Sequence, residues 1–456
     1  MVASACGSGT GASPAPTLLT APETASTTTT STTSTTALAV TTSTSTTSSA
    51  TAASATSAPP ATPPTTAFEP PTTVAPATDP ATTTTSTPPT VSVATAPAQA
   101  PTGKANEQDA WPAFDDVISS FMSRRSLPGA AVAVSYQGQL VYAQTYGTRD
   151  VLNGDPVRYA SRFNFASLSK VFTTATIMHL ADEGRIDLDA RVVDVLASRL
   201  DLPSGYDRRF DAVTIRQLIS HTSGLNPKPP LGPIGAASCD ELVAYSLSKP
   251  LIHDPGTYRY ANANFCLLGD VLETLGEGSW FDVVQRETLQ PLGITDVALG
   301  HPGVTAPGDV IHWADPVATG QNPNFLDALG PAGQLIGTPD DVVRVFDALY
   351  PGSSATPLVR PETFFSMVQP QGVGYPATEY YGYGLFVWDG GATIGHTGSL
   401  PMVRAMVAHQ SNGYTWCILV NGTFDDYSTG FRKVMGDAIA ATGDVWPAVD
   451  YTQLVP

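Results

Sequence analysis

The segment that decides the fold is Phe-Asn-Phe-Ala-Ser-Leu-Ser-Lys, residues 163–170. It begins an apolar helical pattern that continues to about Leu180. Ser167 and Lys170 are three residues apart, and on a helix this spacing places their side chains on one face, within reach of each other. A serine beside an amine is the arrangement of a nucleophile and its base. If Ser167 lies in the first turn, the helix dipole and the burial of Lys170 both favour an activated serine.

The same four letters recur at Ser246-Leu247-Ser248-Lys249. This second copy is expected at the end of a helix that starts near Ser238 and is stopped by Pro250. Ser246 would therefore meet the negative end of a helix dipole, whereas Ser167 would meet the positive end. Only the first copy is interpreted as catalytic.

Composition divides the chain of 456 residues, which carries a net charge of −18. Residues 1–105 consist almost entirely of Thr, Ser, Pro and Ala and have almost no charged side chains. Such a stretch cannot form a hydrophobic core, so we expect a disordered stalk over residues 1–105 and one folded domain over residues 106–456. The acidic balance argues against nucleic acid as a partner.

The first residues, Val2-Ala3-Ser4-Ala5-Cys6, resemble the end of a bacterial lipoprotein signal whose apolar segment is missing. A lipid on Cys6 would turn the stalk into a spacer that holds an extracellular or cell-envelope enzyme at the outer face of a membrane. The alternative is an ordinary cysteine in a disordered tail. The sequence contains no run of about 18 apolar residues, which a membrane-spanning helix requires.

Three further cysteines lie in the folded part. Cys417 is inside Tyr414–Val420, an apolar run typical of a buried strand, and is expected to be a core thiol. Cys239 and Cys266 each lie near the start of a predicted helix, 27 positions apart. In an exported protein they can be oxidised, so we predict one disulfide that braces the segment between them and is worth on the order of 3.5 kcal/mol.

The order of the patterns predicts the fold class. A helix over about 109–123 is followed by alternation over 129–146 around Gln137-Gly138, which indicates an antiparallel hairpin. Helical patterns then dominate to about residue 275: the serine helix, 214–220, 240–248 and 263–275. Short apolar strands return at 385–388, 392–396, 403–409 and 414–420, before a terminal helix at about 429–441. We therefore expect an α/β (α+β) fold, in which N- and C-terminal strands form one antiparallel sheet flanked by helices, plus a helical lobe, with the site in the cleft between them.

Three more motifs follow the serine in sequence: Thr214–Leu225, Tyr260-Ala261-Asn262 and His396-Thr397-Gly398. In this order they resemble the serine beta-lactamase and penicillin-binding protein superfamily over about residues 110–441. Within it, the chain is similar to the branch of class C beta-lactamases, D-alanyl-D-alanine carboxypeptidases and related esterases. The resemblance implies a serine hydrolase that works through an acyl-enzyme. We expect no cofactor and a monomer.

The resemblance also implies roles. Ser167 would be the nucleophile, Lys170 its base, and Tyr260 the group that passes a proton to the leaving group. Asn262 would orient Lys170 and the substrate. The backbone N–H groups of Ser167 and Ser399 would form the oxyanion hole.

The residues just before Ser399 complete the expected site. Thr397 belongs to the substrate-binding motif, and Gly398 fits a close approach by the substrate backbone. His396 would face a substrate carboxylate and would lose its charge near pH ~6.5 unless its surroundings shift its pKa.

The remaining histidines are interpreted as structural. His221 lies in a tight turn of the Thr214–Leu225 motif. The others have no partner at metal-ligand spacing: His179, His253, His301, His312 and His409. No metal site is predicted.

The expected substrate is a small molecule or a peptide, namely a peptidoglycan peptide, an ester or a beta-lactam. By the resemblance, the histidine at position 396 favours a carboxypeptidase or an esterase over an efficient beta-lactamase. The motif Tyr260-Ala261-Asn262, however, has the form that is also found in beta-lactamases of this family, so that alternative stays open. Another class of function is a non-catalytic cell-surface module that binds wall peptide. The presence of Lys170 and Tyr260 together favours the enzyme, and loops at about 231–237, 303–322 and 369–380 are expected to set its specificity.

Overall fold

The computed structural model describes residues 103–104, 112–151, 153–227, 237–301, 305–312, 326–376, 379–443 and 446. The expected stalk, apart from residues 103–104, lies outside the described residues, and so does Cys6. Much of the expected cleft loops at 231–237 and 303–322 also lies outside them. Every helix in the described ranges is too short or too polar to span a bilayer.

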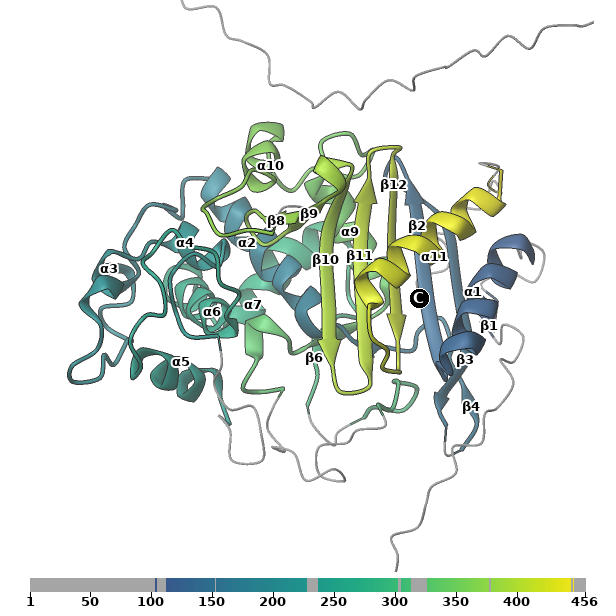
Figure 1. The fold of residues 1–456 in the computed structure, drawn as a ribbon, viewed down its shortest axis with the longest axis horizontal. Helices are drawn as coiled ribbons and strands as arrows, with labels where there is room; N and C mark the ends of the chain where they lie inside the picture. Colours follow the sequence, from purple (N-terminus) through teal and green to yellow (C-terminus); the bar gives the residue numbers. More distant parts are fainter. Residues whose placement is uncertain are drawn as a thin grey trace, which may run out of the picture. The chain divides into compact units, whose positions relative to one another are not determined.

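A nine-stranded antiparallel sheet joins strands from both ends of the described chain (Figure 1). Its path is β1-β3-β2-β12-β11-β10-β9-β8, with β4 paired to β3 off this path. The strands are β1 (Gly103–Lys104), β2 (Gly129–Tyr136), β3 (Gln139–Asp150), β4 (Asp155–Pro156), β8 (Glu379–Tyr381), β9 (Phe386–Trp388), β10 (Thr393–Leu400), β11 (Val403–Gln410) and β12 (Tyr414–Val420). Because β12 pairs with β2, the C-terminal strands complete a sheet begun by the N-terminal hairpin, as predicted.

The hairpin turns where the sequence predicts it. Gln137 and Gly138 connect β2 to β3 with φ of 51° and 83°, and two positive φ values are what a tight two-residue hairpin turn requires. Gly103 and Lys104, at the end of the expected stalk, pair with β3 as an edge strand.

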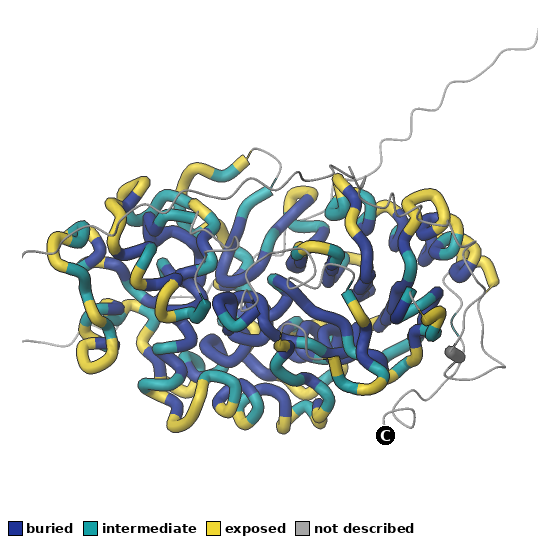
Figure 2. Tube along the Cα trace, turned by 90° about the horizontal axis from the view of Figure 1, so that it is seen from below, coloured by how far each residue is buried: buried dark blue, intermediate teal, exposed yellow. Residues whose placement is uncertain are grey.

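Two layers of helices cover the sheet. The helices α1 (Pro112–Arg125) and α11 (Tyr427–Ala441) bury apolar side chains against one face. On the other face, α2 (Ser169–Asp182) and α9 (Pro339–Leu349) contribute to the larger core. Our sequence interpretation missed α9, although Thr338 followed by Pro339 is a helix-start signal and Thr338 caps the helix. In Figure 2 the buried segments, in dark blue, run through the interior, and exposed turns surround them.

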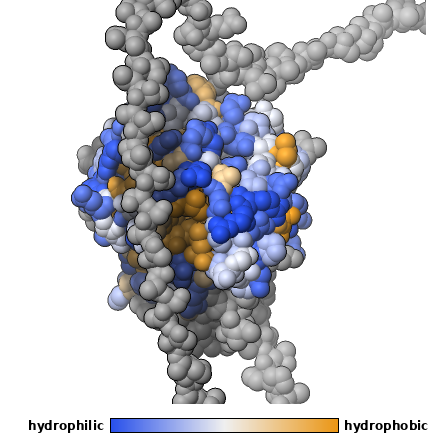
Figure 3. Space-filling model, turned by 90° about the vertical axis from the view of Figure 1, so that its left-hand side faces the viewer, coloured by the Kyte–Doolittle hydropathy of each residue, from blue (hydrophilic) through white to orange (hydrophobic). Residues whose placement is uncertain are grey.

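The remaining helices lie outside these two layers, and most of them form the helical lobe (Figure 1). They are α3 (Val192–Val195), α4 (Ile215–Ile219), α5 (Cys239–Leu247), α6 (Asn262–Gly276), α7 (Trp280–Val284) and α10 (Pro361–Met367). Short helical turns are η1 (Ala166–Leu168), η2 (Arg208–Ala212), η3 (Gln285–Leu289), η4 (Gln290–Leu292), η5 (Gly330–Ala332) and η6 (Asp389–Gly391). The lobe presents a hydrophobic area between hydrophilic residues on the side of α3 and α5 (Figure 3).

A second, three-stranded sheet has the order β5-β7-β6. Its strands are β5 (Phe163–Asn164), β7 (Leu335–Gly337) and β6 (Ala298–Leu299). Strands of two or three residues are too short to produce an alternating pattern, so the sequence did not predict this sheet. It matters for the site, because β5 leads directly into the turn that carries Ser167.

Candidate active site

Ser167 lies in the short turn η1, two residues before α2 begins at Ser169. The residue before it, Ala166, adopts the left-handed region with φ of 48°, a conformation that costs an L-residue roughly 1 kcal/mol. The Oδ1 atom of Asn164 accepts a hydrogen bond from the Ala166 N–H at 2.7 Å and supports this turn. Ser167 is partly buried and lies just before the N-terminal end of α2.

Lys170 is fully buried, and its Nζ atom has three oxygen neighbours. It lies 3.2 Å from Ser167 Oγ, 2.9 Å from Asn262 Oδ1 and 2.6 Å from the Ala332 carbonyl oxygen. A neutral amine has two N–H groups and one lone pair. Because the Asn262 and Ala332 oxygens can only accept, they take the two N–H groups, and the lone pair then faces the Ser167 hydroxyl.

The direction in which the pKa of Lys170 is shifted agrees with this arrangement. Burial lowers the pKa of Lys170 well below its ordinary value, because the ammonium form would lose its hydration. A neutral lysine within hydrogen-bond distance of a serine hydroxyl is a competent general base.

Tyr260 lies in the segment just before α6 and contacts both Lys170 and Ser167. Lys170 Nζ lies 5.0 Å from the centre of the Tyr260 ring, and the Tyr260 hydroxyl forms a hydrogen bond with Ser167. Burial raises the pKa of Tyr260, although the Ser167 contact opposes this shift. The phenol therefore keeps its proton at neutral pH and can donate it.

Strand β10 packs closely against η1, the turn that carries Ser167. A Cβ atom on Gly398 would lie 2.5 Å from the carbonyl oxygen of Phe165 and 3.2 Å from the Cβ of Ala166. We expected Gly398 to make room for the backbone of the substrate, but the space that its missing side chain leaves is occupied by the chain's own turn. The glycine thus brings β10 close to Ser167.

The last residues of β10 form a strand edge. In the described sheet β10 pairs with β9 only from Thr393 to Gly395, so residues 396–400 have a neighbour on one side only. Ser399 is exposed on this edge and Thr397 is partly exposed. This placement is compatible with the expected oxyanion hole, in which the N–H groups of Ser167 and Ser399 would point at the reacting oxygen.

His396 does not titrate as the sequence suggested, because its ring is buried and both of its nitrogens are hydrogen-bonded. It is buried, with Nδ1 2.7 Å from the Thr397 carbonyl oxygen and Nε2 3.0 Å from the Tyr381 hydroxyl. Because a carbonyl can only accept, Nδ1 carries the hydrogen and Nε2 accepts from Tyr381. Burial lowers the pKa of His396 to about 3. The expected loss of charge near pH 6.5 is therefore wrong, and His396 is neutral over the whole physiological range.

Sequence reasoning missed two groups beside the catalytic cluster and undervalued a third. The Ala332 carbonyl and the Tyr381 hydroxyl lie outside the recognised motifs. His221, interpreted as structural, packs its ring 4.1 Å from that of Tyr260 and accepts a hydrogen bond from the Ala261 N–H at 3.3 Å. Burial lowers the pKa of His221 well below its ordinary value. Its place in the Thr214–Leu225 motif was the available sequence signal.

The cysteines follow the predicted pattern. The structure joins Cys239 and Cys266 in a disulfide, whereas Cys417 is buried and free. The prediction of a core thiol at Cys417 is thus confirmed.

The expectation that His179 has no partner at metal-ligand spacing is wrong. Glu183 follows His179 by one helical turn, with 3.7 Å between Nε2 and Oε1, and Glu287 lies close enough to complete a group that could hold a metal. However, Arg185 donates hydrogen bonds to both glutamates, and Arg286 donates to Glu287. These arginines already neutralise the carboxylates.

Comparison with known proteins agrees with the geometry. The family model described as Beta-lactamase matches residues 114–438. A "Probable fimbrial assembly protein FimD, serogroup H1" from Dichelobacter nodosus is 28% identical over 249 residues, which cover 52% of this chain and 59% of that protein. The chain thus spans about three fifths of the length of that relative.

Two further similarities extend over more of the domain. Penicillin-binding protein 4 of Amycolatopsis lactamdurans is 27% identical over 350 residues, covering 70% of this chain and 88% of the relative. The crystal structure of D-amino acid amidase from Ochrobactrum anthropi SV3 complexed with L-phenylalanine amide matches with a TM-score of 0.59 and 20% identity. It covers 73% of this chain and 98% of the amidase, and at this identity it supports the fold alone.

Proposed function

Because the chain belongs to the beta-lactamase family of serine hydrolases, we propose that it is an exported hydrolase that forms an acyl-enzyme on Ser167. The observation that carries this proposal is the environment of Lys170. Its buried amine has two fixed acceptors, Asn262 Oδ1 and the Ala332 carbonyl, and its remaining position faces Ser167 Oγ. A binding module would have no use for a buried, uncharged lysine in this orientation.

The proposed reaction has two halves. Lys170 takes the proton of the Ser167 hydroxyl while Oγ bonds to the carbonyl carbon, and the N–H groups of Ser167 and Ser399 stabilise the oxyanion. Tyr260 protonates the leaving group, which departs, and regains a proton from Lys170. Water then attacks the acyl-enzyme with the same groups acting in reverse, so that the acid is released and Ser167 is restored.

The neutral state of His396 bears on the substrate. A free carboxylate near this residue would meet an uncharged imidazole whose two nitrogens are already hydrogen-bonded. We therefore place an ester or amide without a carboxylate at this position first. A D-alanyl-D-alanine carboxypeptidase comes second, and a beta-lactamase third, because both act on substrates that bear a carboxylate.

The first experiment is the intact mass of the protein after incubation with a fluorophosphonate, with Ser167→Ala as the control. We expect one adduct on Ser167, and its absence would favour a non-catalytic module that binds wall peptide. A panel of an ester, a D-amino acid amide, a D-Ala-D-Ala peptide and a chromogenic cephalosporin then orders the substrates.

A pH series tests the substrate order. The ratio of kcat/KM for the peptide to that for the ester should stay flat between pH ~5 and ~8, since His396 does not titrate there. A ratio that falls across this range would show that His396 is charged in the free enzyme.

Export is the remaining part of the proposal. The Cys239–Cys266 disulfide supports an oxidising location, because disulfides persist in extracellular compartments and are rare in the cytosol. Detection of the protein in the cell envelope or medium, with lipid on Cys6 if it is anchored, would test the expected localisation.

A further inference from the structure

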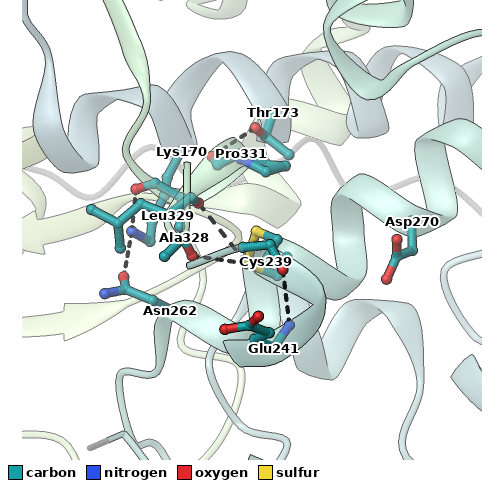
Figure 4. The surroundings of a disulfide bond; sticks show 12 residues. Lys170, Thr173, Cys239, Glu241, Asn262, Asp270, Ala328, Leu329 and Pro331 are labelled. Atoms are coloured by element: carbon teal, nitrogen blue, oxygen red, sulfur yellow. Dashed lines mark hydrogen bonds between the residues drawn. A yellow bond between two sulfur atoms is a disulfide. The ribbon is translucent and has the colours of Figure 1, made fainter. Parts of the chain in front are cut away.

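The disulfide lies directly beneath the segment that supplies one acceptor to Lys170 (Figure 4). A Cβ atom on Gly330 would come within 2.8 Å of Cys239 Sγ. The Sγ atom of Cys266 lies 3.8 Å from the carbonyl oxygen of Ala328 and 3.9 Å from that of Leu329. Residues 328–330 thus pack directly against the two sulfur atoms of the disulfide.

The same segment is attached to α2 on its other side. The Pro331 carbonyl accepts a hydrogen bond from Thr173 Oγ1 at 3.0 Å, and the Leu335 N–H donates to Ser169 Oγ at 3.0 Å. Between these bonds, the Ala332 carbonyl accepts from Lys170 Nζ. The segment is therefore held between the disulfide and the helix of the catalytic lysine.

The disulfide also connects to the second acceptor. Cys266 lies on α6 four residues after Asn262, which places both on one face of the helix. Further along α6, a Cβ on Gly269 would lie 2.5 Å from Pro331 Cγ, so α6 and the segment are in close contact. One bridge thus supports both oxygen atoms that orient the amine of Lys170.

We propose that the Cys239–Cys266 disulfide is a redox-sensitive positioning element that holds Asn262 and Ala332 in place around Lys170. The inference rests on the proposed function of Lys170 as the base. Reduction by a dithiol or phosphine transfers two electrons and two protons to the bridge and gives two thiols, while the reductant is oxidised. Without the bridge the two acceptors lose their fixed positions, the site admits water, and Ser167 loses an oriented base.

The groups around Lys170 determine the direction of the expected pH effect. The titratable groups around it are Ser167 from η1, Tyr260, and the buried imidazoles of His221 and His396, whose pKa values burial lowers. Burial is the cause that lowers the pKa of Lys170, so entry of water should raise it. The acid limb of the activity profile should then move to higher pH.

The experiment compares the full-length oxidised protein with the same protein reduced under native conditions, and with Cys239→Ala/Cys266→Ala as a variant that cannot respond to reductant. Val434→Ala is the matched control, because it creates a cavity in the core of α11 on the opposite face of the sheet. Each is assayed for kcat and KM on an ester against pH, below its melting temperature. In parallel, ¹³C-lysine NMR follows the titration of Lys170, one of five lysines, with Lys170→Arg for assignment.

We expect reduced protein and the double variant to lose about 10-fold or more in kcat at neutral pH, with KM changed less than about threefold. The Lys170 signal should titrate at higher pH in both, and reoxidation should restore the wild type alone. Val434→Ala should melt earlier but keep the pH profile.

Two outcomes would overturn the inference. One is a folded, reduced protein with an unchanged profile and an unchanged Lys170 titration. The other is complete unfolding on reduction at every temperature, which would show that the disulfide stabilises the fold as a whole and does not specifically position the groups around Lys170. Because the NMR titration does not need turnover, failure of Ser167 to react would refute the proposed function separately.

Discussion

The two Ser-x-x-Lys sequences in this chain have opposite environments. Ser167 is partly exposed and its lysine, Lys170, is fully buried; Ser246 is buried and its lysine, Lys249, is exposed. Lys249 points its amine at the ring of Tyr245, 5.1 Å away, rather than at Ser246. The spacing is therefore insufficient for chemistry, and what makes the first copy a candidate site is the burial of its lysine.

The ends of the helices complete the contrast. Ser167 precedes α2, where the positive end of the helix dipole favours an alkoxide, whereas Ser246 lies in the last turn of α5, which ends at Leu247. Around Lys170 two acceptors fix the amine, but the hydroxyl of Ser246 has no hydrogen-bond partner among the described residues. Four predictions test this difference, in order of decreasing effect.

The largest effect should come from the serines. Ser167→Ala should reduce kcat by at least about 10⁴-fold, because it removes the nucleophile. Ser246→Ala removes a buried hydroxyl that forms no hydrogen bond with Ser167, Lys170 or Tyr260, and it should leave kcat within about twofold of wild type. Steady-state assays on the preferred ester measure both. Loss of activity in Ser246→Ala with an unchanged melting temperature would show that the wrong copy has been chosen.

The lysines should differ next. Lys170→Ala should lower kcat by about 10²-fold or more, as expected for a proton-transfer group, while Lys249→Ala should have no measurable effect. Tyr260→Phe should cost a similar factor, and the double variant Lys170→Ala/Tyr260→Phe should be little worse than either, since the two groups serve one proton path. Multiplying losses in the double variant would contradict a shared path.

Much of this contrast was visible in the sequence, because its signals are local. A helix start near Ser238 and a stop at Pro250 placed Ser246 at the wrong end of a helix, and the structure begins α5 at Cys239 and ends it at Leu247. The hairpin at Gln137-Gly138 and the last strand, Tyr414–Val420, were predicted for the same reason. Turn chemistry and uninterrupted apolar runs need no knowledge of distant partners.

The rest of the site depends on contacts that no local pattern encodes. Ala332 contributes only a backbone carbonyl, which any residue provides, and it reaches Lys170 from 162 positions away. The pKa of His396 depends on burial under Tyr381 and Phe386, whereas the sequence offers only the ordinary value of a histidine. Such features follow from packing and were accessible only in three dimensions.

The third prediction concerns strand β10, which packs against the turn that carries Ser167. Gly398→Ala places a Cβ 2.5 Å from the Phe165 carbonyl and should push β10 away from the serine turn, lowering kcat about 10-fold with a smaller change in KM. Gly436→Ala on α11 is the control, because nothing lies within 4 Å of its added carbon and alanine favours a helix. Kinetics of the two variants provide the comparison. Equal activity in both would mean that the contact between β10 and η1 does not position the oxyanion donors.

The smallest effect should appear in stability. Since the pKa of Lys170 is lowered by burial, the unfolded chain binds more protons than the folded one between that lowered value and the unfolded value of ~10.4, and the stability of the wild type therefore rises with pH through this window. Lys170→Met keeps the shape without the amine and should raise the free energy of unfolding at pH ~7 by about 1–2 kcal/mol, the scale on which buried polar groups cost stability. The gain should shrink as the pH approaches ~10, whereas Lys249→Met should change nothing at either pH. Urea unfolding of the three proteins at both pH values is the measurement, and a Lys170→Met variant that is no more stable than wild type at pH ~7 would mean that the bonds to Asn262 and Ala332 repay the burial of this amine in full.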